Sequence, residues 1–206
     1  MDRRSTNLLG AWRLVATIST AIGAGALAFA AIGHFGPDGL RMAIRFTART
    51  SLILFLLAFS ASSLRRLWPS NWTQFLLRNR RYLGLSFAAS HAIHATAIIA
   101  LASSAPAVFR GATSLGTFIF GGIGYVFIAA LTATSFDRTA AAIGPRAWKA
   151  LHTTGVYYLW AQFAVSFAMH ANGALVYWVL LGLIAAAMAL RLAARLRPRG
   201  ELARAH

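Results

Sequence analysis

The sequence contains no cysteine and very few acidic residues. Its 206 residues include 4 Asp and Glu against 20 Lys and Arg. The lack of cysteine excludes disulfides, thiolate metal sites, iron–sulfur clusters and a thiol nucleophile. The net charge of +16 is compatible with nucleic-acid binding, but the basic residues cluster between apolar stretches instead of along one soluble face. We therefore expect no nucleic-acid partner.

Long apolar stretches make up most of the chain, which is 58% hydrophobic with a mean hydropathy of +0.62. Each stretch is close to the ~20 residues that a helix needs to cross a bilayer, and no alternating strand pattern is visible. We predict an all-α, polytopic membrane protein that forms one domain, a six-helix transmembrane bundle over residues 1–206. The predicted spans are residues 14–32, 44–64, 82–102, 115–134, 151–169 and 174–192.

The basic residues set the expected orientation. If the N-terminus is inside, 16 of the 20 Lys and Arg fall on the inner side, and the remainder are Arg41, Arg45, Arg49 and Arg110. We therefore expect a multi-pass protein of the plasma membrane with both termini in the cytoplasm. The first span could alternatively be a signal peptide, but its apolar run is longer than an ordinary h-region, so we expect a retained helix.

Four histidines lie in or next to the apolar spans. His91 and His94 share one face of the third span, and His152 and His170 are 18 residues apart, about five turns and ~27 Å, on the fifth. Imidazoles on facing helices are how helix bundles hold metals and haem. The alternative is that each histidine only hydrogen-bonds to a neighbouring helix. Acidic ligands are missing from the spans, so a compact non-haem metal cluster is not expected.

Arg49 gives independent support for an anionic cofactor. It lies some five residues into the second apolar run, where a guanidinium needs an anion. The chain has few carboxylates to offer, whereas haem carries two propionates that match a guanidinium geometrically. Arg45, closer to the end of the span, is expected to extend to the membrane surface.

Three stretches resemble the ferric-reductase-like transmembrane domain family. They are FTART at residues 46–50, NRRYLGL at 79–85 with His94 nine residues later, and LTATS…IGPRAWKALH from 131 to 152. Within that family the chain is most similar to the haem-binding membrane subunits of bacterial periplasmic methionine sulfoxide reductase systems. The resemblance implies six helices, with b-type haem held between the third and fifth.

Residue by residue, the resemblance makes His94 and His152 the axial ligands of haem iron and Arg49 a further cofactor-binding residue. The family usually has a second histidine about thirteen residues after the first on the fifth helix. This chain has Val165 there, and the nearest histidine is His170. His91 is an additional histidine. Three ligand pairs stay open: His94 with His152, His94 with His170, and His91 with His152. The number of haems, one or two, also stays open.

The expected function is that of an inner-membrane b-type haem subunit in an oxidoreductase system, which transfers electrons but is not a complete enzyme. The expected donors are membrane quinol or a separate cytoplasmic flavin reductase, with quinone or FMN as further candidate ligands. The expected acceptor is a periplasmic partner such as a methionine sulfoxide reductase. The alternatives are a haem-free small transporter or scaffold subunit, and the membrane component of a ferric or other metal reductase.

Overall fold

The structure is a computed structural model that describes residues 3–197. These residues form helices joined by short connections, and no strand occurs among them. The basic segment after Arg197 lies outside the described residues, as does His206. The elements are α1 (Arg3–Ile32), α2 (Pro37–Leu67), α3 (Asn71–Arg78), α4 (Arg80–Ser104), α5 (Pro106–Ala112), α6 (Leu115–Ala133), α7 (Asp137–Ala168), η1 (Ala171–Gly173) and α8 (Leu175–Leu196).

Five of the described helices are long and apolar enough to cross a membrane: α1 from residue 11, α2, α4, α6 and α8. The prediction of an all-helical, multi-pass membrane chain is confirmed to this extent. The predicted fifth span, residues 151–169, falls almost entirely within α7, which is long but is not one of the five. A sixth crossing therefore stays a prediction.

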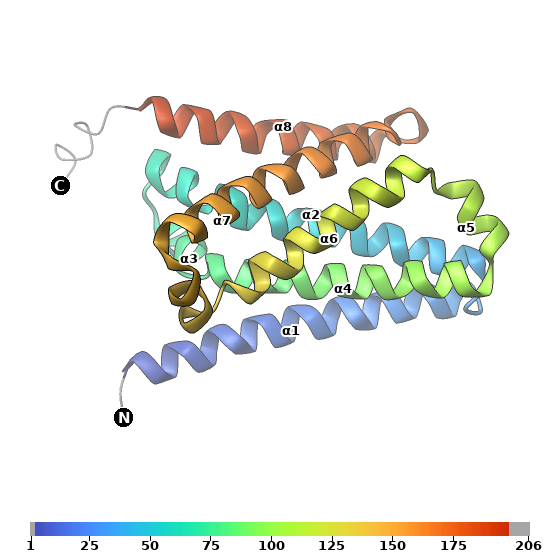
Figure 1. Ribbon diagram of the computed structural model, residues 1–206, viewed down its shortest axis with the longest axis horizontal. Helices are drawn as coiled ribbons and strands as arrows, with labels where there is room; N and C mark the ends of the chain where they lie inside the picture. Colours follow the sequence, from blue (N-terminus) through green and yellow to red (C-terminus); the bar gives the residue numbers. More distant parts are fainter. Residues whose placement is uncertain (1–2, 198–206) are drawn as a thin grey trace.

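The helices form a long bundle whose two ends differ (Figure 1). At one end lie the start of α1, the short helix α3, the α6–α7 connection and the end of α8. We name this the α3 end. At the other end lie the α1–α2 turn, α5 and η1, and we name this the η1 end. Helices α1, α2 and α4 pack along one another, and α2 also packs against α8.

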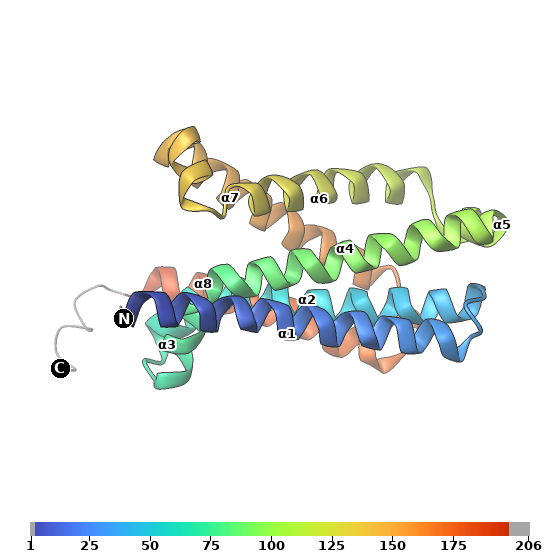
Figure 2. The ribbon, with the colours of Figure 1, turned by 90° about the horizontal axis from the view of Figure 1, so that it is seen from below.

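Helices α6 and α7 form a second pair, which packs against the rest of the bundle less closely (Figure 2). They approach each other at Gly155, where an added Cβ would lie 3.0 Å from the Phe127 ring. α7 bends near its start, because Gly144 has φ +76° and Pro145 follows it. The bend turns the chain after the α6–α7 connection and directs the rest of α7 towards α8.

Several boundaries differ from the sequence prediction for local reasons. α2 begins at Pro37, seven residues before the predicted span, because proline at the first helical position is pre-organised for a helix start. This extension adds Arg41 to the helix, and both Arg41 and Arg45 are exposed there. The short helix α3 was not predicted. Its start is fixed by a capping box in which the Ser70 side chain accepts a hydrogen bond from the Thr73 backbone.

Candidate functional site

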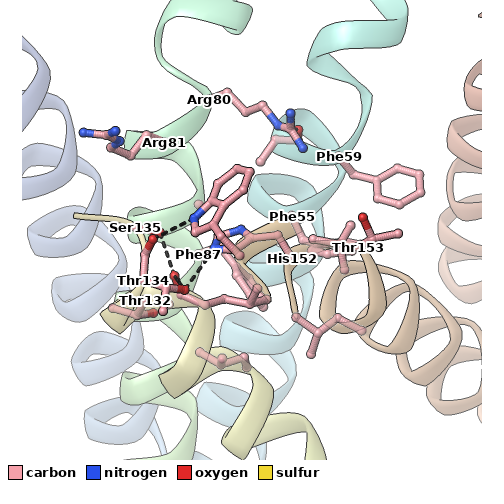
Figure 3. A pocket seen from close by; sticks show the side chains of 18 of the residues that line it. Phe55, Phe59, Arg80, Arg81, Phe87, Thr132, Thr134, Ser135, His152 and Thr153 are labelled. Carbon is pink, nitrogen blue, oxygen red and sulfur yellow. Dashed lines mark hydrogen bonds between the residues drawn. The ribbon is translucent and has the colours of Figure 1, made fainter. Parts of the chain in front are cut away.

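A cavity of about 510 Å³ lies towards the α3 end of the bundle, between α4 and α7 (Figure 3). Its volume is within the range of small-molecule and cofactor pockets. Apolar side chains make up most of its wall, and α2, α6 and α8 contribute to it as well. The apolar lining includes Phe55, Phe59, Phe87, Ile128, Val156 and Leu159.

Basic side chains also line this cavity. They are Arg80, Arg81, Lys149 and Arg191, and no carboxylate lines the wall among the described residues. Arg81 forms an ion pair with Asp137 at 2.5 Å on the exposed surface. Arg80 instead donates to the carbonyl of Ala58 at 3.1 Å. The cavity therefore combines an apolar interior with excess positive charge, which suits an apolar ligand that carries anionic groups.

His152 lies in the wall of the cavity and is held by Thr134 and Trp148. The Thr134 hydroxyl donates to the Ala130 carbonyl at 2.7 Å, so it accepts from the His152 Nε2–H at 2.9 Å. The indole of Trp148 stacks on the His152 ring with 4.3 Å between centroids, and its Nε1–H donates to the Thr134 carbonyl. In this arrangement the free lone pair of His152 is on Nδ1.

His94 lies deeper in the bundle and has the opposite tautomer. Its Nδ1 is 3.1 Å from the carbonyl of Ile44 and 3.0 Å from the hydroxyl of Thr47. A carbonyl oxygen can only accept, so Nδ1 carries the proton and Nε2 keeps its lone pair. Metal-binding histidines are commonly fixed this way, with one ring N–H on a backbone carbonyl and the other nitrogen free. His94 is therefore prepared to act as an Nε2 ligand.

His91 is packed among aromatic rings, and its buried Nδ1 has no hydrogen-bond partner within residues 3–197. Its ring centroid is 5.0 Å from that of His94, 5.1 Å from Tyr125, 5.4 Å from Phe87 and 6.0 Å from Phe163. The Tyr125 hydroxyl is also buried with no hydrogen-bond partner in the described part of the chain. Buried polar atoms without partners are costly, and they often mark a place where a ligand or water binds.

Arg49 and His170 meet at Tyr177, towards the η1 end. The Arg49 guanidinium lies 5.5 Å from the Tyr177 ring centroid, and its buried Nε has no hydrogen-bond partner among residues 3–197. His170 stacks on the same tyrosine at 5.7 Å. Its Nδ1 donates to the Ser166 carbonyl at 2.8 Å, which leaves Nε2 with a free lone pair, as in His94.

The predicted site residues thus fall into two groups. His152 lines the cavity at the α3 end, while His91, His94, His170 and Arg49 do not line it. A series of aromatic contacts runs from His91 through Phe163, Phe167 and Tyr177 to His170, each with ring centroids about 6 Å apart. The structure does not place His94 in contact with His152. Within residues 3–197, no three His, Asp or Glu side chains gather as a metal site.

Of the groups that a b-type haem needs, the cavity offers an apolar slot, basic side chains and one imidazole, that of His152, while His91, His94 and His170 lie outside its wall. Haem needs nitrogen ligands, an apolar slot and cations for its propionates. Phe87 connects the two groups of site residues, because it lines the cavity and also contacts the His91 ring. The structure also places Trp148 in the cavity wall beside His152, and the site residues predicted from the sequence did not include it. Its spacing of four residues from His152 was the available signal.

Comparison with known proteins gives no assignment for this chain. No family model matches it, and neither a curated protein nor a solved structure matches it. The resemblance to the ferric-reductase-like family therefore stays a prediction from the sequence.

Proposed function

We propose that this chain is a b-type haem subunit that transfers electrons across a bacterial plasma membrane. The observation that carries the proposal is the cavity between α4 and α7, with its apolar wall, its basic residues and its histidine. The proposal takes α7 as the sixth membrane crossing and places both termini in the cytoplasm. Helices α4 and α7 then correspond to the third and fifth spans, between which the family resemblance expects haem.

The chain's own residues have distinct roles in this proposal. His94 offers Nε2 as an iron ligand while Ile44 and Thr47 hold the opposite side of its ring. Three ligand pairs stay open: His94 with His152, His94 with His170, and His91 with His152. In the two pairs that include His152, this residue must leave Thr134 to offer Nε2. Arg80, Lys149 and Arg191 supply cations for propionates at the cavity, and Arg49 supplies one towards the η1 end. Haem itself supplies the one-electron redox chemistry when it is bound.

The packed aromatic side chains keep water away from this region. Phe55, Phe87 and Phe163 contact one another with ring centroids 5.4 to 6.1 Å apart, between the cavity and the half-buried pair His91 and His94. A dry, apolar surrounding is one of the factors that set the reduction potential of a metal centre. In the proposed system, quinol or a flavin reductase donates electrons on the cytoplasmic side. A periplasmic partner such as a methionine sulfoxide reductase accepts them.

The test is a reduced-minus-oxidised visible spectrum of the purified protein in detergent, with haem quantified chemically. We expect the sharp α-band of low-spin b haem. We expect His94→Ala to lose most of it, and the losses in His91→Ala, His152→Ala and His170→Ala to identify the second ligand. His34→Asn is the matched control, because His34 lies in the α1–α2 turn at φ 52°, a conformation that asparagine tolerates. A flat spectrum from protein produced with ample haem would overturn the proposal.

One observation favours a second candidate, a haem-free transporter or scaffold subunit. His152 already donates its Nε2–H to Thr134, so its hydrogen bonding is satisfied without a metal. If that role is purely structural, His152→Ala and His94→Ala should lower stability, and the wild-type protein should show no haem absorbance. The same spectra and a thermal unfolding measurement on each variant distinguish the two functions.

A further inference from the structure

A second, smaller hollow lies at the α3 end, where the last turns of α2 and α8 run side by side. Its volume is about 170 Å³, which is large enough for a small ionic group but not for a cofactor. Three arginines and two serines make up most of its lining. The lining residues are Ser62, Ser63, Arg66, Arg191, Ala194 and Arg195.

Each of the three arginines is held by neutral groups. Arg191 donates to the Phe59 carbonyl at 3.0 Å, and its guanidinium lies 4.4 Å from the centroid of the Phe59 ring. Arg195 donates to the Tyr157 hydroxyl at 2.7 Å. Arg66 donates through Nη2 to the Arg197 carbonyl, while its buried Nε has no hydrogen-bond partner in the described chain. Within residues 3–197, none of the three forms an ion pair with a carboxylate.

This arrangement places like charges around one hollow without a compensating anion among residues 3–197. Like charges repel, and a buried guanidinium N–H without an acceptor adds a further cost. A bound phosphate group removes both costs. It offers several oxygen acceptors to the guanidinium donors, and arginine is the residue whose geometry best matches phosphate. The Ser62 and Ser63 hydroxyls provide additional donors at the same hollow.

The position of the hollow indicates which kind of phosphate group it could bind. It lies at the ends of two of the apolar, membrane-crossing helices, α2 and α8, where lipid headgroups are found. Basic pockets between transmembrane helices are known to bind the headgroups of anionic lipids. We propose that this hollow binds the phosphodiester of an anionic phospholipid. The proposal does not depend on haem binding, since only Arg191 is shared with the larger cavity.

The test uses the full chain in nanodiscs of phosphatidylcholine, with or without phosphatidylglycerol. It measures the thermal unfolding midpoint of the protein and, by native mass spectrometry, the lipids that the protein retains. We expect phosphatidylglycerol to raise the midpoint of the wild type and to be retained. In the Arg66→Gln/Arg195→Gln variant the gain should disappear, with binding about fivefold weaker for each guanidinium removed. The control variant is Arg78→Gln/Arg146→Gln, which removes two exposed arginines that do not line the hollow.

Each outcome decides the proposal. Loss of the lipid effect in the first double variant alone supports a built site. An equal loss in both variants, or no loss in either, would overturn it in favour of general surface charge. A third arm adds inorganic phosphate to phosphatidylcholine nanodiscs, and an equal gain there would overturn the assignment to lipid. If the first double variant does not fold, Arg195→Gln alone is compared with Arg78→Gln, since the hydrogen bond from Arg195 to the Tyr157 hydroxyl lies on the exposed surface.

Discussion

The two sides of α4 are built differently. On the α2 side, hydroxyl groups are fully buried and bonded across the interface, as between Ser51 and Ser90 at 2.8 Å and between Thr47 and His94 at 3.0 Å. On the α7 side, contacts run between aromatic rings, and the cavity of about 510 Å³ separates the helices. One side of the helix is therefore closely packed and polar, and the other is open and mostly apolar.

This difference shows how one helix can both fix a histidine and leave space beside it. Small hydroxyl residues allow α2 and α4 to approach closely, and cross-helix hydrogen bonds then set their register. The same register places the His94 Nδ1 on the carbonyl of Ile44. Large aromatic residues on the opposite side keep α7 at a distance. The packed side supplies stability, and the open side supplies the volume that a ligand needs.

The largest effect is expected from adding a side chain at Gly39, where α1 and α2 approach each other next to their connecting turn. A Cβ on Gly39 would lie 2.5 Å from the carbonyl oxygen of Ala30 and 3.0 Å from the Cα of Gly33. Backbone atoms cannot move aside as a flexible side chain can, so we expect Gly39→Val to cost more than about 3 kcal/mol and to reduce folded yield sharply. Monodispersity in size-exclusion chromatography and thermal unfolding measure this.

The matched control is Gly182→Val on α8, where an added Cβ meets no atom within 4 Å. We expect it to fold with near-wild-type stability. Equal folded yields for the two variants would show that the α1–α2 approach is not as close as described.

A smaller effect is expected from removing one hydrogen bond of the packed side. Thr47→Val keeps the shape of the side chain but loses the hydroxyl contacts to His94 and to the Ala43 carbonyl. Hydrogen bonds between membrane helices contribute about 0.6 kcal/mol on average and up to about 1.7, so we expect a loss in that range. The free energy of unfolding in detergent measures it. Thr96→Val is the control, because the exposed Thr96 hydroxyl bonds only within its own helix; equal losses would contradict a cross-helix role.

The sequence was sufficient to predict the helical class, because long apolar runs leave few alternatives to a membrane helix. The same reasoning predicts His91, His94 and Arg49 as site residues, because polar atoms are costly in such runs, and their roles stay predictions. It could not predict the bend at Gly144 or the capping of α3, although the Ser70-to-Thr73 spacing was an available signal for the latter. The sequence indicates which residues permit a helix to bend or end, and tertiary packing determines at which of them it does so.

The roles of individual histidines depended on contacts that the sequence does not contain. The sequence predicts the same role for His94 and His152, yet His94 donates through Nδ1 and His152 donates through Nε2. The cause is the neighbour: a backbone carbonyl of α2 for His94, and the hydroxyl of Thr134 at the end of α6 for His152. Neither neighbour is close to its histidine in sequence, so tautomer and ligand competence could not be predicted from the histidine spacing alone.

The smallest effect on stability, and the sharpest test of the open side, is expected from filling the cavity. Gly84 lines the cavity, and an added Cβ there meets no atom within 4 Å. Gly84→Leu should therefore leave the free energy of unfolding unchanged or raise it by up to about 1 kcal/mol, the gain in helix propensity over glycine. Because the leucine side chain occupies the proposed cofactor space, haem content should fall at the same time.

Gly122→Leu on the exposed face of α6 is the control. It gives the same gain in helix propensity without entering the cavity, so its haem content should match that of the wild type. If Gly84→Leu loses haem but not stability, and Gly122→Leu loses neither, the cavity is the space that the cofactor occupies and is not needed for packing. Full haem content in Gly84→Leu would place the cofactor outside this cavity.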